Sequence, residues 1–263
     1  MISPELHLPE LLKTAQTAAL EAGQAILSIY ASADFEVEYK DDASPLTRAD
    51  QAAHSVINRH LAPLGLPILS EEGAQLAYDQ RTLWPWYWLV DPLDGTKEFI
   101  KRNGEFTVNI ALMQNTKPVA GVVYAPVLDT LYAGSLFTGV YKIERGISQP
   151  LAPLAQKRTL DALRQLPSVR IIASRTHSTP ETEAFIQQFQ QVELVSMGSS
   201  LKFMLLAEQK ADLYPRFAPT MEWDTAAAHA LLSALGQGIY LPDLSGELTY
   251  NKPSLLNPSF LAF

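Results

Sequence analysis

The sequence predicts an α/β protein whose N-terminal part is α+β and whose C-terminal part alternates strands with helices. Three observations lead to this class. Helical apolar spacing opens the chain, a series of apolar strands divided by turns follows, and alternating strands and helices end it. Strands joined by turns favour an antiparallel sheet, whereas alternating strands and helices favour an α/β layer.

The N-terminal region is expected to hold two helices around a short strand. Apolar residues recur at helical spacing from Leu11 to Ile29. Alternation of apolar and charged residues predicts a strand at 35–39, and the composition of 41–45 predicts a loop. Thr47 is a favourable cap for a second helix, which ends near His60.

A meander of strands and then an alternating series follow. Strands are expected at 67–70 and 86–90, and a series at 105–112, 119–124, 130–133 and 139–143 forms the meander. The stretch 148–167 holds three prolines among mixed polar residues, so we place a domain boundary there, after residue 155. In the second domain, strands are expected at 169–173, 192–195 and 211–214, and helices at 179–189, 199–207 and 224–235.

Composition limits the function. The 263 residues carry a net charge of −8, which argues against a nucleic-acid polymer as partner, because such binding requires a basic face. The absence of cysteine excludes disulfides, thiolate metal sites and cysteine nucleophiles. No apolar run approaches the roughly 18 residues of a membrane span, and the N-terminus lacks the pattern of a secretory signal. We therefore expect a cytoplasmic protein that acts on a small molecule.

One turn carries groups suited to both a metal and a phosphate. The sequence DPLDGT at 91–96 directly follows the apolar strand that ends at Val90. Its proline and glycine favour a tight turn that aims the carboxylates of Asp91 and Asp94 at one point and exposes the Leu93 carbonyl. Such oxygens suit Mg²⁺, and free N–H groups at a helix start suit phosphate. The hexapeptide alone fits a solvated surface turn equally well, because turns are rich in aspartate.

Acidic residues at two distant positions strengthen the metal hypothesis. Glu71 and Glu72 stand at the end of another short apolar strand, and Asp224 stands at the start of a predicted helix. Taken singly, the glutamates fit a solvated turn and Asp224 fits a helix cap. Together with the turn at 91–96, these acids have the composition of a two-metal phosphatase site.

Three signatures give the chain a family resemblance. Ser70-Glu71-Glu72, the turn at 91–96 and Trp223-Asp224-Thr225-Ala226-Ala227 resemble the signatures of the inositol monophosphatase superfamily. Longer strings resemble its bacterial 3'(2'),5'-bisphosphate nucleotidase branch, namely DPLDGTKEFI at 91–100, GEFTVNIAL at 104–112, GSSLKF at 198–203 and YPRF at 214–217. The resemblance extends from the first helix to Asn257 and implies the layered αβαβα sandwich of that superfamily.

The resemblance implies a set of ligands for two or three Mg²⁺ ions. They are the carboxylates of Glu71, Asp91, Asp94 and Asp224 and the carbonyl of Leu93. Asp91 would bridge two ions, and Glu72 would be only a neighbour of the ligand Glu71. Most of these ligands fall in the α+β sub-domain 1–155, while Asp224 falls with the substrate contacts in the α/β sub-domain 156–263.

The resemblance also implies the catalytic groups. In such enzymes water attacks the phosphate directly, and the metals lower the pKa of that water, hold the phosphate and stabilise the leaving oxygen. The Thr–Asp pair of the family, which takes a proton, maps onto Thr96 and Asp50, and Glu71 completes the catalytic set. From its position alone, Asp50 fits better as an exposed acid in the first turn of a helix.

Substrate contacts map onto the turn and the second half of the chain. They are Gly95, Thr96, Ser199, Lys202, Arg216 and His177. Lys202 either contacts a phosphate as a point charge or lies solvated on an amphipathic helix. Arg216 stands either at the mouth of the site or in a surface salt bridge. His177 belongs to a segment that resembles one near the adenosine site of the nucleotidases, although a lone histidine is more often structural.

The leading hypothesis is a Mg²⁺-dependent phosphatase that converts adenosine 3',5'-bisphosphate to AMP and phosphate, with the sulfated relative PAPS as a second substrate. The alternative is an inositol or sugar phosphatase on the same scaffold. Lys97-Glu98-Phe99 favours the nucleotidase, because inositol phosphatases tend to carry an Asn-Phe pair there.

Two further hypotheses involve either a different phosphatase mechanism or no catalysis. Haloacid-dehalogenase phosphatases place two aspartates two residues apart, whereas Asp91 and Asp94 are three apart. A nucleotide sensor without turnover is the non-enzymatic reading, because fold alone does not give function. The sequence leaves open the oligomeric state and attachment to the inner face of the cytoplasmic membrane.

Overall fold

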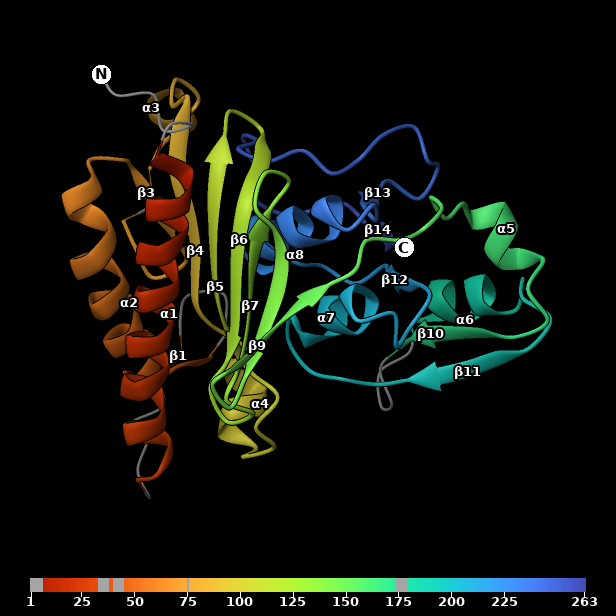
Figure 1. The fold of residues 1–263 in the computed structure, drawn as a ribbon, viewed down its shortest axis with the longest axis horizontal. Coiled ribbons are helices and arrows are strands. Elements are labelled where there is room, and N and C mark those ends of the chain that lie inside the picture. The colour runs from red at the N-terminus through yellow and green to blue at the C-terminus, as the bar shows by residue number, and fades with distance from the viewer. Residues whose placement is uncertain (1–6, 33–37, 40–44, 75, 174–178) are drawn as a thin grey trace.

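The elements stack in five layers, helix–sheet–helix–sheet–helix, which confirms the predicted α/β class and its αβαβα layering (Figure 1). This arrangement comes from a computed structural model of the chain. The structure describes residues 7–32, 38–39, 45–74, 76–173 and 179–263. None of the helices in these segments combines the length and the hydropathy needed to cross a bilayer.

The first layer is a pair of helices, α1 (Leu8–Tyr30) and α2 (Arg48–Leu61). Each is amphipathic, and its apolar face packs with one face of the large sheet into a single core. A capping box at Thr47 starts α2. The short helix η2 (Ala62–Leu64) follows α2 directly and ends at Gly65, whose φ of 73° is accessible to glycine. The two predicted N-terminal helices are therefore confirmed.

The second layer is a seven-stranded sheet in the order β3-β4-β5-β6-β7-β8-β9. Its strands are β3 (Ile68–Ser70), β4 (Trp86–Asp94), β5 (Thr107–Gln114), β6 (Lys117–Ala125), β7 (Thr130–Ser135), β8 (Gly139–Glu144) and β9 (Ile147–Leu151). β3 pairs with β4 in parallel, and every later pairing is antiparallel, as the predicted meander requires. Two short strands, β1 (Glu38–Tyr39) and β2 (Pro45–Leu46), pair outside this sheet.

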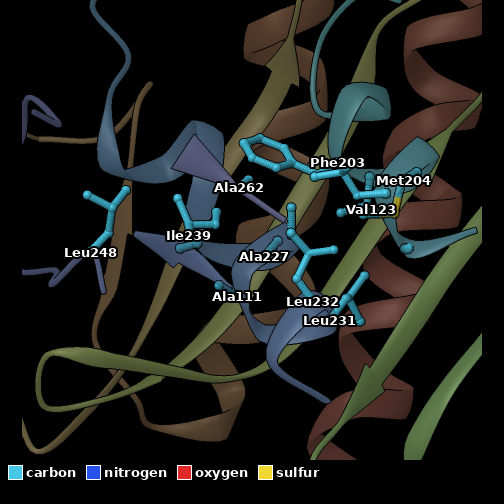
Figure 2. Packing of buried hydrophobic residues seen from close by; sticks show 14 of the residues in the cluster. Ala111, Val123, Phe203, Met204, Ala227, Leu231, Leu232, Ile239, Leu248 and Ala262 are labelled. Carbon is cyan, nitrogen blue, oxygen red and sulfur yellow. The ribbon is translucent and has the colours of Figure 1, made fainter. Parts of the chain in front are cut away.

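The middle layer consists of α7 (Leu201–Ala207) and α8 (Glu222–Ala234). α8 is apolar on almost all sides because it lies between the two sheets, and Figure 2 shows its Leu231 and Leu232 packed among side chains of both. Gly121 of β6 allows the helix to approach closely: a Cβ atom there would stand 2.1 Å from the Ala227 carbonyl oxygen.

The second sheet separates this layer from two outer helices, α5 (Leu160–Arg164) and α6 (Pro180–Ile186). It comprises the parallel pair β10 (Val169–Ile172) and β11 (Val192–Val195), and the antiparallel set β12 (Tyr214–Arg216), β14 (Phe260–Ala262) and β13 (Ile239–Tyr240). A bridge between Ile171 and Leu213 joins the two groups. Alternate residues of β14 face opposite cores, since Phe260 packs toward α7 and α8 whereas Leu261 packs toward α5 and α6.

The structure differs from several expected boundaries. β4 continues to Asp94 instead of ending at Val90, because β5 stays paired with it. The strand expected at 211–214 forms instead at β12, where β14 supplies its partner. The short elements α3 (Tyr78–Arg81), α4 (Thr96–Ile100), α5, β9, β13 and β14 were not predicted as separate elements. The division at residue 155 stays a prediction.

Candidate active site

A β-bulge in β4 brings the two aspartates of the turn to one side of the sheet. Asp91 pairs with Asn109 and Asp94 pairs with Thr107, so three steps along β4 match two steps along β5. In a regular strand, residues three apart point to opposite faces. The extra residue cancels this inversion, and the two carboxylates converge.

The third carboxylate of this group comes from the middle layer. Asp224 lies in the first turn of α8, and its Oδ2 accepts a hydrogen bond from the Met221 N–H at 2.8 Å. One carboxylate oxygen from each of Asp91, Asp94 and Asp224 lies within 4.8 Å of the others. Three carboxylates at this separation are a donor set suited to hard divalent cations.

Asp94 is held by an array of donors on a single oxygen. Its Oδ2 accepts from Ser199 Oγ at 2.6 Å, from the Ser200 N–H at 2.6 Å and from Ser200 Oγ at 2.8 Å. Ser199, whose hydroxyl and whose following N–H both donate to Asp94, has a φ of 50°. Asp94 Oδ1 receives no hydrogen bond from the residues that the structure describes, which leaves it available to a cation.

Burial and mutual repulsion make this triplet unfavourable without a cation. Burial, followed by the charges of Glu71, Asp94 and Asp224, raises the pKa of Asp91 well above its ordinary value. Burial and the charge of Asp94 likewise raise the pKa of Asp224, although Arg216 opposes the shift. A bound divalent cation would relieve the repulsion, so the residues present fit a metal site.

Glu71 and Glu72 have different surroundings, although they are adjacent. The Glu71 N–H donates to the Val90 carbonyl at 3.1 Å, which extends the β3–β4 pairing toward Asp91. The charge of Glu71 acts on Asp91, whereas that of Glu72 acts on the His54 imidazole. Glu71 thus borders the carboxylate triplet without belonging to its compact core, and its role as a ligand stays a prediction.

The structure brings Asp50 and Thr96 together beside the triplet. Asp50 Oδ2 accepts from the Thr47 N–H at 2.8 Å and from Thr47 Oγ1 at 2.6 Å, which orients the carboxylate. Its Oδ1 accepts from Thr96 Oγ1 at 3.2 Å, and Thr96 Oγ1 also lies 3.4 Å from the Leu93 carbonyl oxygen. Asp50 is 2% exposed, so the exposed first-turn acid that its position alone would allow is excluded.

A cavity of about 660 Å³ opens beside Asp94 and Asp224. Of the predicted substrate residues, those on its wall are Gly95, Ser199, Lys202 and Arg216. Lys202 Nζ donates to the Ser199 carbonyl at 3.2 Å, and Arg216 lies close enough to Asp224 to influence its pKa. Thr96 is not among the residues of this wall and instead contacts Asp50. The predicted contact His177 falls outside the described residues.

Sequence reasoning missed some residues that support the site. Ser200 donates to Asp94, and its Oγ also lies 2.8 Å from the Asp224 carbonyl oxygen, so it connects the two layers. Asn109 donates to Ser200 Oγ at 2.9 Å. Both lie in strings that resemble the nucleotidases, 198–203 and 104–112, but only the fold reveals what they contact.

Comparison with known proteins places the chain in a family. Its sequence matches the profile of the inositol monophosphatase family over residues 7–261. The chain belongs to this family. Members of the family depend on metal ions, in agreement with the acidic cluster described above.

Individual relatives resemble the chain over nearly its whole length. The 3'(2'),5'-bisphosphate nucleotidase CysQ of Salmonella typhimurium is 47% identical over 92% of this chain and 95% of its own. The crystal structure of CysQ from Bacteroides thetaiotaomicron is 48% identical, with a TM-score of 0.82 over 95% of this chain and 96% of that one. Inositol monophosphatase from Anabaena shares the fold at 23% identity, with a TM-score of 0.71 over 97% and 91% of the two chains.

Proposed function

We propose that this protein is a Mg²⁺-dependent nucleotidase that removes the 3'-phosphate of adenosine 3',5'-bisphosphate, with PAPS as a second substrate. The substrate assignment rests on the 47% identity to a 3'(2'),5'-bisphosphate nucleotidase over 92% of the chain. The chemistry is supported independently by the carboxylate triplet beside a cavity that holds cationic side chains. The alternative, an inositol or sugar phosphatase, has only the more distant relatives in its favour.

The proposed metal ligands are the carboxylates of Glu71, Asp91, Asp94 and Asp224 and the carbonyl of Leu93. Two or three Mg²⁺ ions held there would polarise the phosphate, lower the pKa of the attacking water and offset charge on the leaving oxygen. The protein keeps the triplet compact through donors that fix one oxygen each: Leu93 N–H on Asp91, Ser200 on Asp94 and Met221 N–H on Asp224.

Asp50 and Thr96 are proposed to handle the proton. Thr47 fixes one carboxylate oxygen of Asp50, and the other oxygen faces the Thr96 hydroxyl at 3.2 Å. When the Thr96 hydroxyl donates to Asp50, its oxygen can accept a hydrogen bond from a water molecule at the edge of the triplet. Asp50 then receives the proton through Thr96, while its burial excludes competing solvent.

The cavity wall is proposed to bind the nucleotide. Gly95 and Thr96 would offer backbone N–H groups to the reacting phosphate. Lys202 and Arg216 would contact the second phosphate. Ser199 would also contact the substrate, and His177 would belong to the adenosine site. At about 660 Å³ the cavity is within the range of small-molecule sites, roughly 300–1,000 Å³.

Product analysis tests this assignment. Adenosine 3',5'-bisphosphate is incubated with the protein and Mg²⁺, and the nucleoside monophosphate formed is identified by chromatography against AMP and adenosine 3'-phosphate. We expect AMP, and we expect Asp91→Asn to abolish its formation. Release of the 5'-phosphate instead, or full activity of the variant, would contradict the proposed reaction or the metal site respectively.

A further inference from the structure

A buried polar network surrounds the start of α8. The segment Asn251–Asn257, which we name the C-terminal clamp, contacts both the first turn of α8 and the helix α3 that precedes β4. Its residues do not line the cavity of about 660 Å³. The network therefore needs an explanation other than substrate contact.

Glu222 is the buried anion of this network. Its side chain is 0% exposed, yet it accepts from the Asn251 N–H at 2.6 Å, the Lys252 N–H at 3.1 Å and Lys252 Nζ at 2.5 Å. A buried carboxylate is costly unless such donors surround it. Because Glu222 stands two residues before Asp224 in the same helical turn, these bonds fix the start of α8 to the clamp.

Arg81 connects the clamp to the other side of the site. It is 2% exposed, and its Nη1 donates to Asn251 Oδ1 at 2.7 Å. Its Nη2 donates to the carbonyls of Lys252 and Pro253 at 2.6 and 2.9 Å, and its own carbonyl accepts from Asn251 Nδ2 at 2.8 Å. Arg81 ends α3, so this fork ties the clamp to the chain that enters β4, the strand of Asp91 and Asp94.

The far end of the clamp reaches Met221, whose amide holds Asp224. Asn257 Nδ2 donates to the Met221 carbonyl at 2.8 Å, and Leu256 forms an isolated antiparallel β-bridge with Met221. The Met221 N–H in turn donates to Asp224 Oδ2 at 2.8 Å. Both ends of the clamp thus act on the residues immediately before Asp224.

We propose that the clamp, through Glu222 and Arg81, is a positioning device that sets Asp224 at metal-binding distance from Asp91 and Asp94. This inference rests on the proposed metal-dependent function. It assigns Glu222 and Arg81 a role in cation affinity, although neither touches the cation or the substrate. Residues that orient ligands typically contribute about 10- to 100-fold in metal affinity.

The test measures Mg²⁺ binding directly by calorimetry, without substrate, in wild type, Glu222→Gln, Arg81→Lys and Asp212→Asn. Asp212→Asn is the matched control, because Asp212 also is a buried carboxylate with three bonds from one cationic residue, Arg170, at 2.7 to 2.9 Å. It does not belong to the carboxylate triplet or the cavity wall. Urea unfolding of each variant measures the accompanying loss in the free energy of unfolding.

We expect Glu222→Gln and Arg81→Lys to bind Mg²⁺ about 10-fold more weakly or worse, while Asp212→Asn keeps wild-type affinity at a comparable loss of stability. Raising Mg²⁺ should then restore most of kcat in the two clamp variants. If Glu222→Gln does not fold, Arg81→Lys alone decides the question. Wild-type affinity in the clamp variants, or equal weakening in Asp212→Asn, would overturn the inference. Absence of Mg²⁺ binding by the wild type would instead refute the proposed function and the inference with it.

Discussion

Gly121→Ala is expected to damage the site by displacing α8, the helix that carries Asp224. The added Cβ would stand 2.1 Å from the Ala227 carbonyl oxygen and 2.9 Å from its carbonyl carbon. Both atoms belong to the backbone, so no side chain can rotate away. Because interiors are close-packed, α8 and β6 must separate by about 1 Å to restore ordinary contact.

The magnitude has two parts. Overpacking of this kind costs about 1–3 kcal/mol of stability. Ala227 lies one turn after Asp224, so a displacement of the helix carries that carboxylate away from Asp91 and Asp94. A misplacement of about 1 Å in such a site can reduce the rate by roughly 100-fold. Elsewhere a Gly→Ala change compatible with the backbone stabilises a protein by about 0.4–1 kcal/mol, so the expected sign is itself informative.

Phosphate release at several Mg²⁺ concentrations, together with urea unfolding, provides the assay. Gly246→Ala is the control, because no atom lies within 4 Å of the added Cβ and the backbone there needs no glycine. We expect this control to behave as wild type. Full activity and unchanged stability in Gly121→Ala would refute the reasoning that the α8–β6 contact determines the position of Asp224.

The remaining predictions concern the proton pair, the support of Asp94, the cation and pH. Asp50→Asn should lower kcat by about 100- to 10,000-fold in steady-state assays while the fold persists; activity near wild type would exclude Asp50 as the proton acceptor. Ser200→Ala removes a donor 2.8 Å from Asp94 and should weaken Mg²⁺ binding by about 10-fold in calorimetry, whereas Ser200→Thr should retain most of it. Mg²⁺ at 100 times its dissociation constant should stabilise the fold by about 2.7 kcal/mol in thermal unfolding, and Asp91→Asn should lose much of this gain. Burial raises the pKa of Asp212, but hydrogen bonds from Arg170 outweigh it and the net pKa is lowered. Asp212 therefore stabilises the fold above its ordinary pKa of about 3.9 and less as the pH falls through the lowered value, so the deficit of Asp212→Asn in urea unfolding should be large at pH 7 and shrink below pH 4; a deficit independent of pH would contradict it.

The strongly periodic parts of the fold could be predicted from sequence, and the contact-dependent parts could not. α1 carries its own apolar stripe, and the meander strands alternate with recognisable turns. By contrast, β13 and β14 are two and three residues long and exist only because partners pair with them. β4 extends past Val90 for the same reason, since Asp91 and Asp94 pair with β5.

The site shows the same limit. The residue types at Asp91, Asp94 and Asp224 indicated oxygen ligands, but their sequence separation gives no distance. The bulge that brings Asp91 and Asp94 to one face is a property of the β4–β5 register, which spacing does not reveal. Asp50 fitted a solvated acid until burial and the contact with Thr96 were known. The supporting Ser200 could be found only when the layers were assembled.

The central claim is that the carboxylate triplet is a metal site for nucleotide dephosphorylation. Phosphate release from adenosine 3',5'-bisphosphate and from inositol 1-phosphate, measured side by side with Mg²⁺ and with chelator, tests it most directly. We predict a strong preference for the nucleotide that chelator abolishes and restored Mg²⁺ recovers. Preference for inositol phosphate would contradict the substrate assignment, and release from neither substrate would contradict the enzymatic function itself.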